Sequence, residues 1–90
     1  MIHDEFFKEL YILQDGIINL MLSKENQYEN IEDLLKDTTY ESIYRMLELL
    51  DGFGINNTKY EVKDVSKGMI LNDNCNMHDK CEDYLMHTDI

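Results

Sequence analysis

The stretch Thr38-Thr39-Tyr40-Glu41-Ser42-Ile43-Tyr44-Arg45-Met46-Leu47-Glu48-Leu49-Leu50-Asp51-Gly52 carries the clearest start and stop signals in the sequence. Thr38 and Glu41 have the spacing of a capping box, in which both side chains satisfy free backbone N–H groups at a helix start. Gly52 suits the left-handed turn that often follows a helix. The apolar residues between them recur at helical spacing: Tyr40, Ile43, Tyr44, Leu47 and Leu50. We therefore predict a helix from Thr38 to Gly52, with Leu47 in the core.

Two further helices are predicted upstream. The first runs from Asp4 to about Leu22, because a 4-3-4-3 apolar spacing indicates one buried face and a second apolar seam runs beside it. Gly16 lies inside this pattern, which continues past it. We expect one helix, and a break at Asp15-Gly16 is the alternative. A short helix from Tyr28 to Lys36 follows. The two seams are Phe6, Leu10, Leu13, Ile17 and Leu20, and Phe7, Tyr11, Ile18 and Met21.

Downstream of Gly54 the apolar period changes to that of strands. Tyr60 and Val62 alternate with charged residues, and Met69 to Leu71 form a second short run. The segment Asp64–Gly68 has the composition of a hairpin connection. A last helix is expected from Met77 to His87, with Asn76 as its cap. The sequence thus predicts one domain over residues 1–90, of the α+β class and mostly helical: three N-terminal helices, a β-hairpin and a C-terminal helix.

The charge is strongly negative and unevenly distributed. Nineteen acidic residues outnumber eight basic ones, which gives a net charge of −11. Residues 28–54 contribute −5 and residues 72–90 contribute −4, whereas residues 55–71 sum to +1. This balance disfavours direct binding to a nucleic-acid backbone. It suits either a solvated surface or a face for a basic partner. Because no apolar run approaches the ~18–20 residues of a membrane span and no basic leader segment is visible, we expect a cytoplasmic protein that does not enter a membrane.

One cluster near the C-terminus has the residue types of a zinc site: Cys75, His78, Cys81 and His87. On a continuous helix, His78 and Cys81 would be neighbours, but His87 would lie ~13 Å further along. A closed zinc site needs four ligands, so we predict no metal and no cofactor. His78 is then expected to be exposed beside Glu82, and Cys81 to be buried. No nucleophile with an oriented base is recognisable, so the chain is not expected to be an enzyme.

Two segments resemble a known group of proteins. These segments are Thr39–Phe53 and Met77–Leu85. A helix that ends in Leu50-Asp51-Gly52-Phe53, followed by a hairpin and a closing helix that begins with His78-Asp79 and ends in Asp83-Tyr84-Leu85, is similar to small uncharacterised proteins of Gram-positive bacteria of the toxin-immunity type. The resemblance covers about half the chain. It implies a small, acidic, non-catalytic protein that binds a protein partner, and it assigns no active-site residue.

The function expected is therefore that of an immunity or inhibitor protein that occludes a basic surface of its partner. The residues expected to bind come from the most acidic stretch, together with a tyrosine that lies off any apolar stripe and is expected to be exposed: Tyr28, Glu29, Glu32, Asp33 and Asp37. One alternative is a phage or mobile-element protein that mimics nucleic acid and inhibits a DNA-binding enzyme. Another is a structural homo-oligomeric subunit, because the two seams of the first helix offer enough apolar surface for a homodimer.

Overall fold

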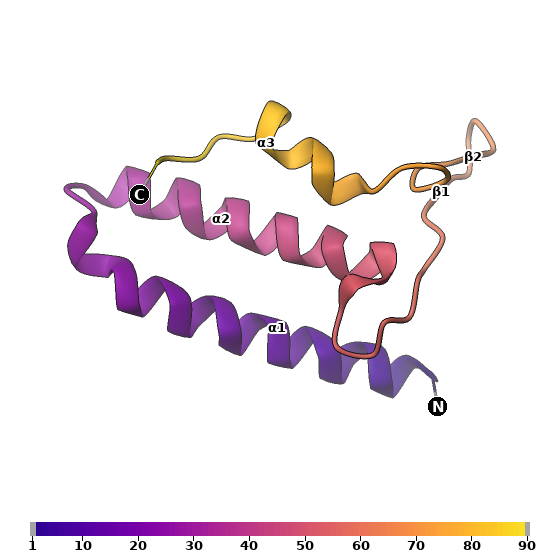
Figure 1. The fold of residues 1–90 in the computed structure, drawn as a ribbon, viewed down its shortest axis with the longest axis horizontal. Helices are drawn as coiled ribbons and strands as arrows, with labels where there is room; N and C mark the ends of the chain where they lie inside the picture. Colours follow the sequence, from indigo (N-terminus) through magenta and orange to yellow (C-terminus); the bar gives the residue numbers. More distant parts are fainter. Residues whose placement is uncertain (1, 90) are drawn as a thin grey trace.

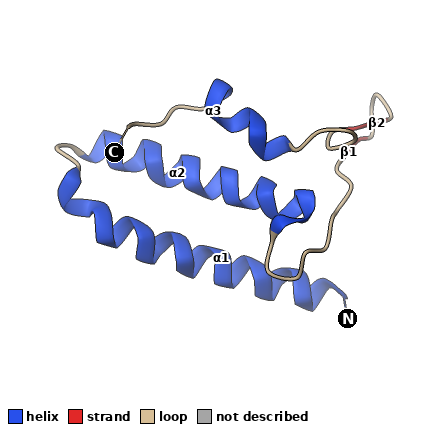
Figure 2. Ribbon diagram, in the orientation of Figure 1, coloured by secondary structure: helices blue, strands red, loops and turns tan. Residues whose placement is uncertain are grey.

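The computed structural model describes residues 2–89 and places most of them in helices (Figures 1 and 2). The elements in chain order are α1 (Ile2–Lys24), the 3₁₀ turn η1 (Glu25–Gln27), α2 (Ile31–Glu48), the π-helical turn η2 (Leu49–Phe53), β1 (Lys63–Asp64), β2 (Met69–Ile70), the 3₁₀ turn η3 (Met77–Lys80) and α3 (Cys81–Tyr84). The mostly helical α+β class predicted from the sequence is confirmed. None of the helices in this part of the chain has the length and apolar content needed to cross a membrane.

Three segments lie side by side. Helices α1 and α2 are antiparallel, and the chain from η3 to the C-terminus runs along α2 on the side away from α1 (Figure 1). The hairpin projects at the end of α2 where η2 lies. The C-terminal end of the chain therefore returns to the beginning of α2, close to the η1 connection.

Helix α1 is continuous through Gly16, as predicted, and ends at Lys24. Gly16 is exposed, and a Cβ built on it would meet no atom within 4 Å. Fixing Gly16 in a helical conformation therefore costs backbone entropy, but the glycine interrupts neither the hydrogen bonds nor the packing of α1.

The prediction of separate second and third helices is wrong, because α2 is one helix over Ile31–Glu48. Its N-cap is Asn30, whose side-chain oxygen accepts the Asp33 amide at 2.9 Å. Thr38, the predicted cap, lies inside the helix, and its hydroxyl donates to the Leu34 carbonyl at 2.7 Å. Threonine hydroxyls can satisfy a preceding helical carbonyl in this way, so the Thr-x-x-Glu spacing alone does not mark a helix start.

The end of α2 is a π-helical turn closed by Gly52, whose φ of 99° lies in the left-handed region. A Cβ at this position would come within 3.1 Å of the Lys59 Cβ, so both the conformation and the space favour glycine. The predicted role of Gly52 in stopping the helix is confirmed.

The hairpin is shorter than predicted. Strands β1 and β2 pair antiparallel, with Lys63 opposite Ile70 and Asp64 opposite Met69. The Asp64 carboxylate accepts the Ser66 and Lys67 amides at 3.0 and 3.2 Å, which fixes the turn as the sequence predicted. Residues 60–62 were predicted to be a strand but are irregular. The fully buried Asn72 holds them, because its side chain accepts the Val62 amide at 3.0 Å and donates to the Tyr60 carbonyl at 2.5 Å.

The predicted last helix over Met77–His87 is also too long. A 3₁₀ turn and four residues of α-helix end at Tyr84, and the chain is extended from Leu85. Asn76 occupies the N-cap position of η3, but its side chain makes no capping hydrogen bond.

The apolar core is small. Among the residues described, the buried hydrophobic side chains are Ile17, Met21, Leu49 and Cys81. Leu49 is 3% exposed, whereas Leu47, the leucine predicted to be core, is half-buried. The helical period selected the wrong leucine because η2 changes the residue spacing at the end of α2.

We predict that Leu49→Ala lowers the free energy of unfolding by ~2–5 kcal/mol, because it leaves a cavity in the centre of a small core. Ile43→Ala is the matched control on the same helix, since Ile43 is 44% exposed, and its effect should be below ~1 kcal/mol. Urea unfolding followed by circular dichroism measures both values. Equal losses for the two variants would show that Leu49 is not the centre of the core.

Candidate functional site

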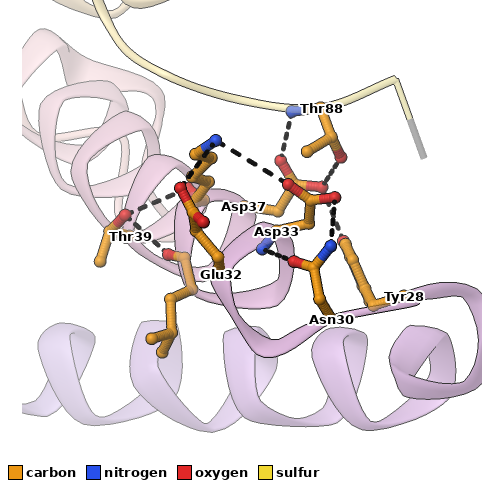
Figure 3. Close-up of polar contacts among 9 residues, drawn as sticks. Tyr28, Asn30, Glu32, Asp33, Asp37, Thr39 and Thr88 are labelled. Carbon is orange, nitrogen blue, oxygen red and sulfur yellow. Dashed lines mark hydrogen bonds and ion pairs between the residues drawn. The ribbon is translucent and has the colours of Figure 1, made fainter.

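Two of the predicted partner-binding residues, Tyr28 and Asp37, form internal hydrogen bonds rather than an exposed surface. We call the cluster of Tyr28, Asp37 and Thr88 the Asp37 lock. Asp37 is 6% exposed, and its carboxylate accepts the Tyr28 hydroxyl at 2.7 Å (Figure 3). The backbone amide of Thr88 donates to the same carboxylate at 2.6 Å, and the Thr88 hydroxyl donates a second hydrogen bond. Three segments therefore meet at Asp37: the loop before α2, α2 itself and the segment around Thr88, which is 51 residues away in sequence.

The Asp37 lock changes the acidity of both of its ionisable members. Burial raises the pKa of Tyr28 to about 12, and the hydrogen bond to Asp37 and the surrounding negative charge act in the same direction. For Asp37, burial acts to raise the pKa, but hydrogen bonds from Thr88 and Tyr28 outweigh it and lower the pKa below its usual value. The structure therefore favours a charged Asp37 beside a neutral Tyr28.

The prediction that Tyr28 is exposed is wrong. Tyr28 is half-buried, whereas Tyr11 and Tyr84 are 71% and 80% exposed. The hydrogen bond to Asp37 explains the difference, because it draws the phenol toward α2 over nine residues of sequence. The spacing of apolar residues in the sequence cannot reveal such a polar contact.

The other three predicted residues lie near the surface at the start of α2. Glu32 is exposed and pairs with Lys36 at 3.4 Å, and Asp33 approaches the same lysine at 3.9 Å (Figure 3). The Asp33 amide also donates the capping hydrogen bond to the Asn30 side chain. Glu29 is exposed in the loop. Carboxylates in the first turn of a helix are stabilised by the backbone dipole, so these acids have a structural role independent of any partner.

A second buried carboxylate, Asp51, ties the C-terminal segment to the end of α2. Its Oδ2 accepts the backbone amide of His78 at 3.0 Å and lies 2.8 Å from the Nδ1 of the same residue. The ring of His78 packs edge-on against Phe53 and Tyr44, with centroids 5.1 and 5.4 Å away. His78 is 7% exposed, so the prediction of an exposed histidine beside Glu82 is wrong. The Asp51 carboxylate is the partner that allows the imidazole to be buried.

Docking of this segment creates a groove between α2 and the η3–α3 region, which we call the acidic groove. Six residues line it: Tyr40, Glu41, Tyr44, His78, Asp79 and Glu82. The groove has a volume of about 280 Å³. Its formation brings together the two stretches that carry most of the negative charge, residues 28–54 and 72–90.

Two stacked tyrosines form the α2 side of the acidic groove. The rings of Tyr40 and Tyr44 lie 6.0 Å apart with an interplanar angle of 18°. Burial raises the pKa of each phenol, and nearby negative groups, which include Glu82 for Tyr40 and Glu48 and Asp79 for Tyr44, raise it further. Both phenols stay neutral, and the local potential is negative. The groove thus combines carboxylates with aromatic surface, which is the chemistry that binds a cationic side chain.

The cysteines and histidines of the candidate zinc cluster, for which we predict no metal, each have different neighbours in the fold. Cys81 is buried, and burial followed by the charge of Asp51 raises the pKa of its thiol, which makes it a weak nucleophile. Cys75 is exposed and donates weakly to the Leu71 carbonyl. The ring of His87 lies over Tyr40, with centroids 4.7 Å apart. Over residues 2–89, no three His, Cys, Asp or Glu side chains are placed so that they could hold a metal ion.

Comparison of the chain with protein-family models, with curated proteins and with solved structures gives no match.

Sequence reasoning missed the acidic groove because its two sides are more than thirty residues apart. One signal was present. The two segments noted for their resemblance, Thr39–Phe53 and Met77–Leu85, are the segments that Asp51 and His78 join. An aspartate before a helix-ending glycine and a distant histidine could have been proposed as a pair.

We predict that acid weakens the fold through Asp37. Because the pKa of this carboxyl is lower in the folded chain than its usual value of 3.8, its stabilising contribution is present above that value and is lost as the pH falls through the folded pKa. Asp37→Asn should reduce stability at neutral pH and flatten the decline between about pH 5 and 3. Chemical unfolding across this range measures the effect.

Glu29→Gln is the control for that experiment, since it removes one exposed carboxylate from the same segment. It should keep the dependence on pH seen for the unmodified chain. If Asp37→Asn and Glu29→Gln have the same profile, the Asp37 lock does not control acid stability.

Proposed function

We propose that this chain is a non-enzymatic module that binds a partner protein through a basic surface of the partner, in the manner of an immunity or inhibitor protein. The observation that carries the proposal is the acidic groove, where carboxylates border the stacked rings of Tyr40 and Tyr44. A lysine or arginine side chain of the partner fits this chemistry, because its charge would meet carboxylates and its stem would lie against aromatic faces.

The carboxylates of the groove differ in how they are engaged. Glu41 already pairs with Arg45 at 3.0 Å on α2. Asp79 and Glu82 are exposed, and the closest basic group to Asp79 is the His78 Nε2, at 3.5 Å. We therefore assign the contact with a partner cation mainly to Asp79 and Glu82. Glu29 and Glu32, at the start of α2, would extend the negative surface toward the C-terminal end of the chain.

The net charge of −11 contributes to association as well as to the contact itself. A negative field of this kind speeds encounter with a basic surface, and salt screens the effect. If the partner is an enzyme whose basic cleft binds phosphates, such as a nuclease, occupation of the cleft would inhibit it. Inhibition then requires no chemistry from this chain, only a complementary surface.

The experiment that tests the proposal is capture of a partner by the immobilised chain, with the product of the neighbouring gene as the probe. We expect the probe to be retained at low salt and released as the salt concentration rises. If the probe is not retained at low salt, the assignment of this function is contradicted.

For the captured partner, we predict that Glu82→Lys weakens binding about tenfold or more, because it replaces a groove carboxylate with a repelling charge. Glu61→Lys makes the same charge change at an exposed position outside the groove and should alter affinity less than about threefold. Calorimetry or surface plasmon resonance measures both. Equal effects of the two variants would mean that net charge, rather than the groove, determines binding.

A further inference from the structure

The chain exposes more surface than a folded monomer of its size. Its accessible area is 6763 Å², whereas ~5,500 Å² is typical of a monomer with this mass. The radius of gyration is 14.7 Å, against about 12 Å for a compact chain of this length. One protomer of a standard interface loses roughly 800 Å², so the excess is large enough to supply a dimer interface.

The excess includes an apolar stripe on α1, formed by Phe7, Tyr11, Ile18 and Leu22 and crossed at its middle by the polar residues Gln14 and Asp15. The four apolar side chains are 63%, 71%, 49% and 58% exposed. At 3.6 residues per turn they point within about 60° of one another. The stripe borders two adjoining hollows between α1 and α2, which share Ile17, Ile18 and Thr38 in their walls.

The charge of this face excludes the partner proposed for the acidic groove. Among the described residues that line the two hollows, Glu25 is the only charged one, and no lining residue is shared with the groove. Apart from Glu25 and the exposed Asp15 at the middle of the stripe, a basic surface would meet no carboxylate among these residues. The face therefore needs an apolar occupant.

The stripe is complementary to itself. Its positions are symmetric about the midpoint between Gln14 and Asp15, so an antiparallel copy of α1 would place Phe7 opposite Leu22 and Tyr11 opposite Ile18. Each aromatic ring would meet an aliphatic side chain. At the centre, Gln14 and Asp15 lie on opposite flanks of the stripe, ~100° apart around the helix, so each would lie across from its own copy. The two Gln14 amides can exchange hydrogen bonds, whereas the two Asp15 carboxylates would face each other at the exposed edge.

We propose that the α1 stripe is the interface of a two-fold symmetric dimer, in which the α1 helices of two copies of this chain pack antiparallel. A two-fold axis requires that residue i meets residue j and that j meets i, and the stripe has this property. The antiparallel arrangement also opposes the helix dipoles favourably. Each dimer would present two acidic grooves, one from each copy.

Sedimentation equilibrium on the full chain tests the proposal. We expect a species of twice the 10.7 kDa chain mass. Salt should tighten association, because both chains carry a net charge of −11, whereas salt should weaken binding to a basic partner. A mass of one chain at the highest soluble concentration overturns the proposal and leaves the proposed function intact.

Ile18→Lys and Ile12→Lys form a matched pair, since the two isoleucines are 49% and 50% exposed on different faces of α1. Ile18→Lys should weaken dimerisation roughly 100-fold, because it places an ammonium group in an apolar contact. Ile12→Lys should leave it unchanged. Dimerisation that survives Ile18→Lys, or that both variants abolish, contradicts the assigned face.

Cysteine crosslinking reads the register independently, with Cys75→Ser in every chain to remove the exposed native thiol. A mixture of Tyr11→Cys and Ile18→Cys chains should crosslink. Ile18→Cys alone should not, because seven residues separate it from its symmetric copy along the paired helices, or ~10 Å. Efficient crosslinking of Ile18→Cys alone would indicate parallel helices and would refute the antiparallel interface.

Discussion

The hydrogen bonds between Asp51 and His78 are the interaction on which the rest of the structure depends. Asp51 lies in the π-helical turn that ends α2, and His78 begins the segment that returns along that helix. A single carboxylate oxygen takes both the backbone amide and the ring nitrogen of His78. This contact fixes η3 beside α2, and the acidic groove needs both of these walls.

Buried carboxylates make similar long-range hydrogen bonds at two other places. Three of the nineteen acidic residues are buried, and each joins segments that are distant in sequence. Glu9 on α1 accepts the Asn56 amide at 3.1 Å, and Asp37 binds Thr88. Because few apolar side chains are fully buried, these polar contacts determine how the loops and the C-terminal segment pack on the two helices. A buried carboxylate that loses its donors is costly, which makes each contact specific.

Local signals predicted the parts of the fold that depend on local interactions. The apolar spacing of α1, the left-handed Gly52 and the turn at Asp64 were all readable from the sequence. Thr38 misled the prediction because a threonine hydroxyl can satisfy a carbonyl inside a helix as well as an amide at its start. The last helix was predicted too long because Asp37 draws Thr88 into an extended conformation, a contact over 51 residues. The acidic groove was beyond prediction for the same reason, since it exists only after Asp51 and His78 have met.

The most direct measurement is amide hydrogen exchange on residues 77–88, compared between the unmodified chain and Asp51→Ala. We expect slow exchange at the His78 amide in the unmodified chain. We also expect Asp51→Ala to speed exchange in η3 and α3 while α1 keeps its protection. Exchange in this segment that is fast in the unmodified chain, or that Asp51→Ala leaves unchanged, would contradict the account.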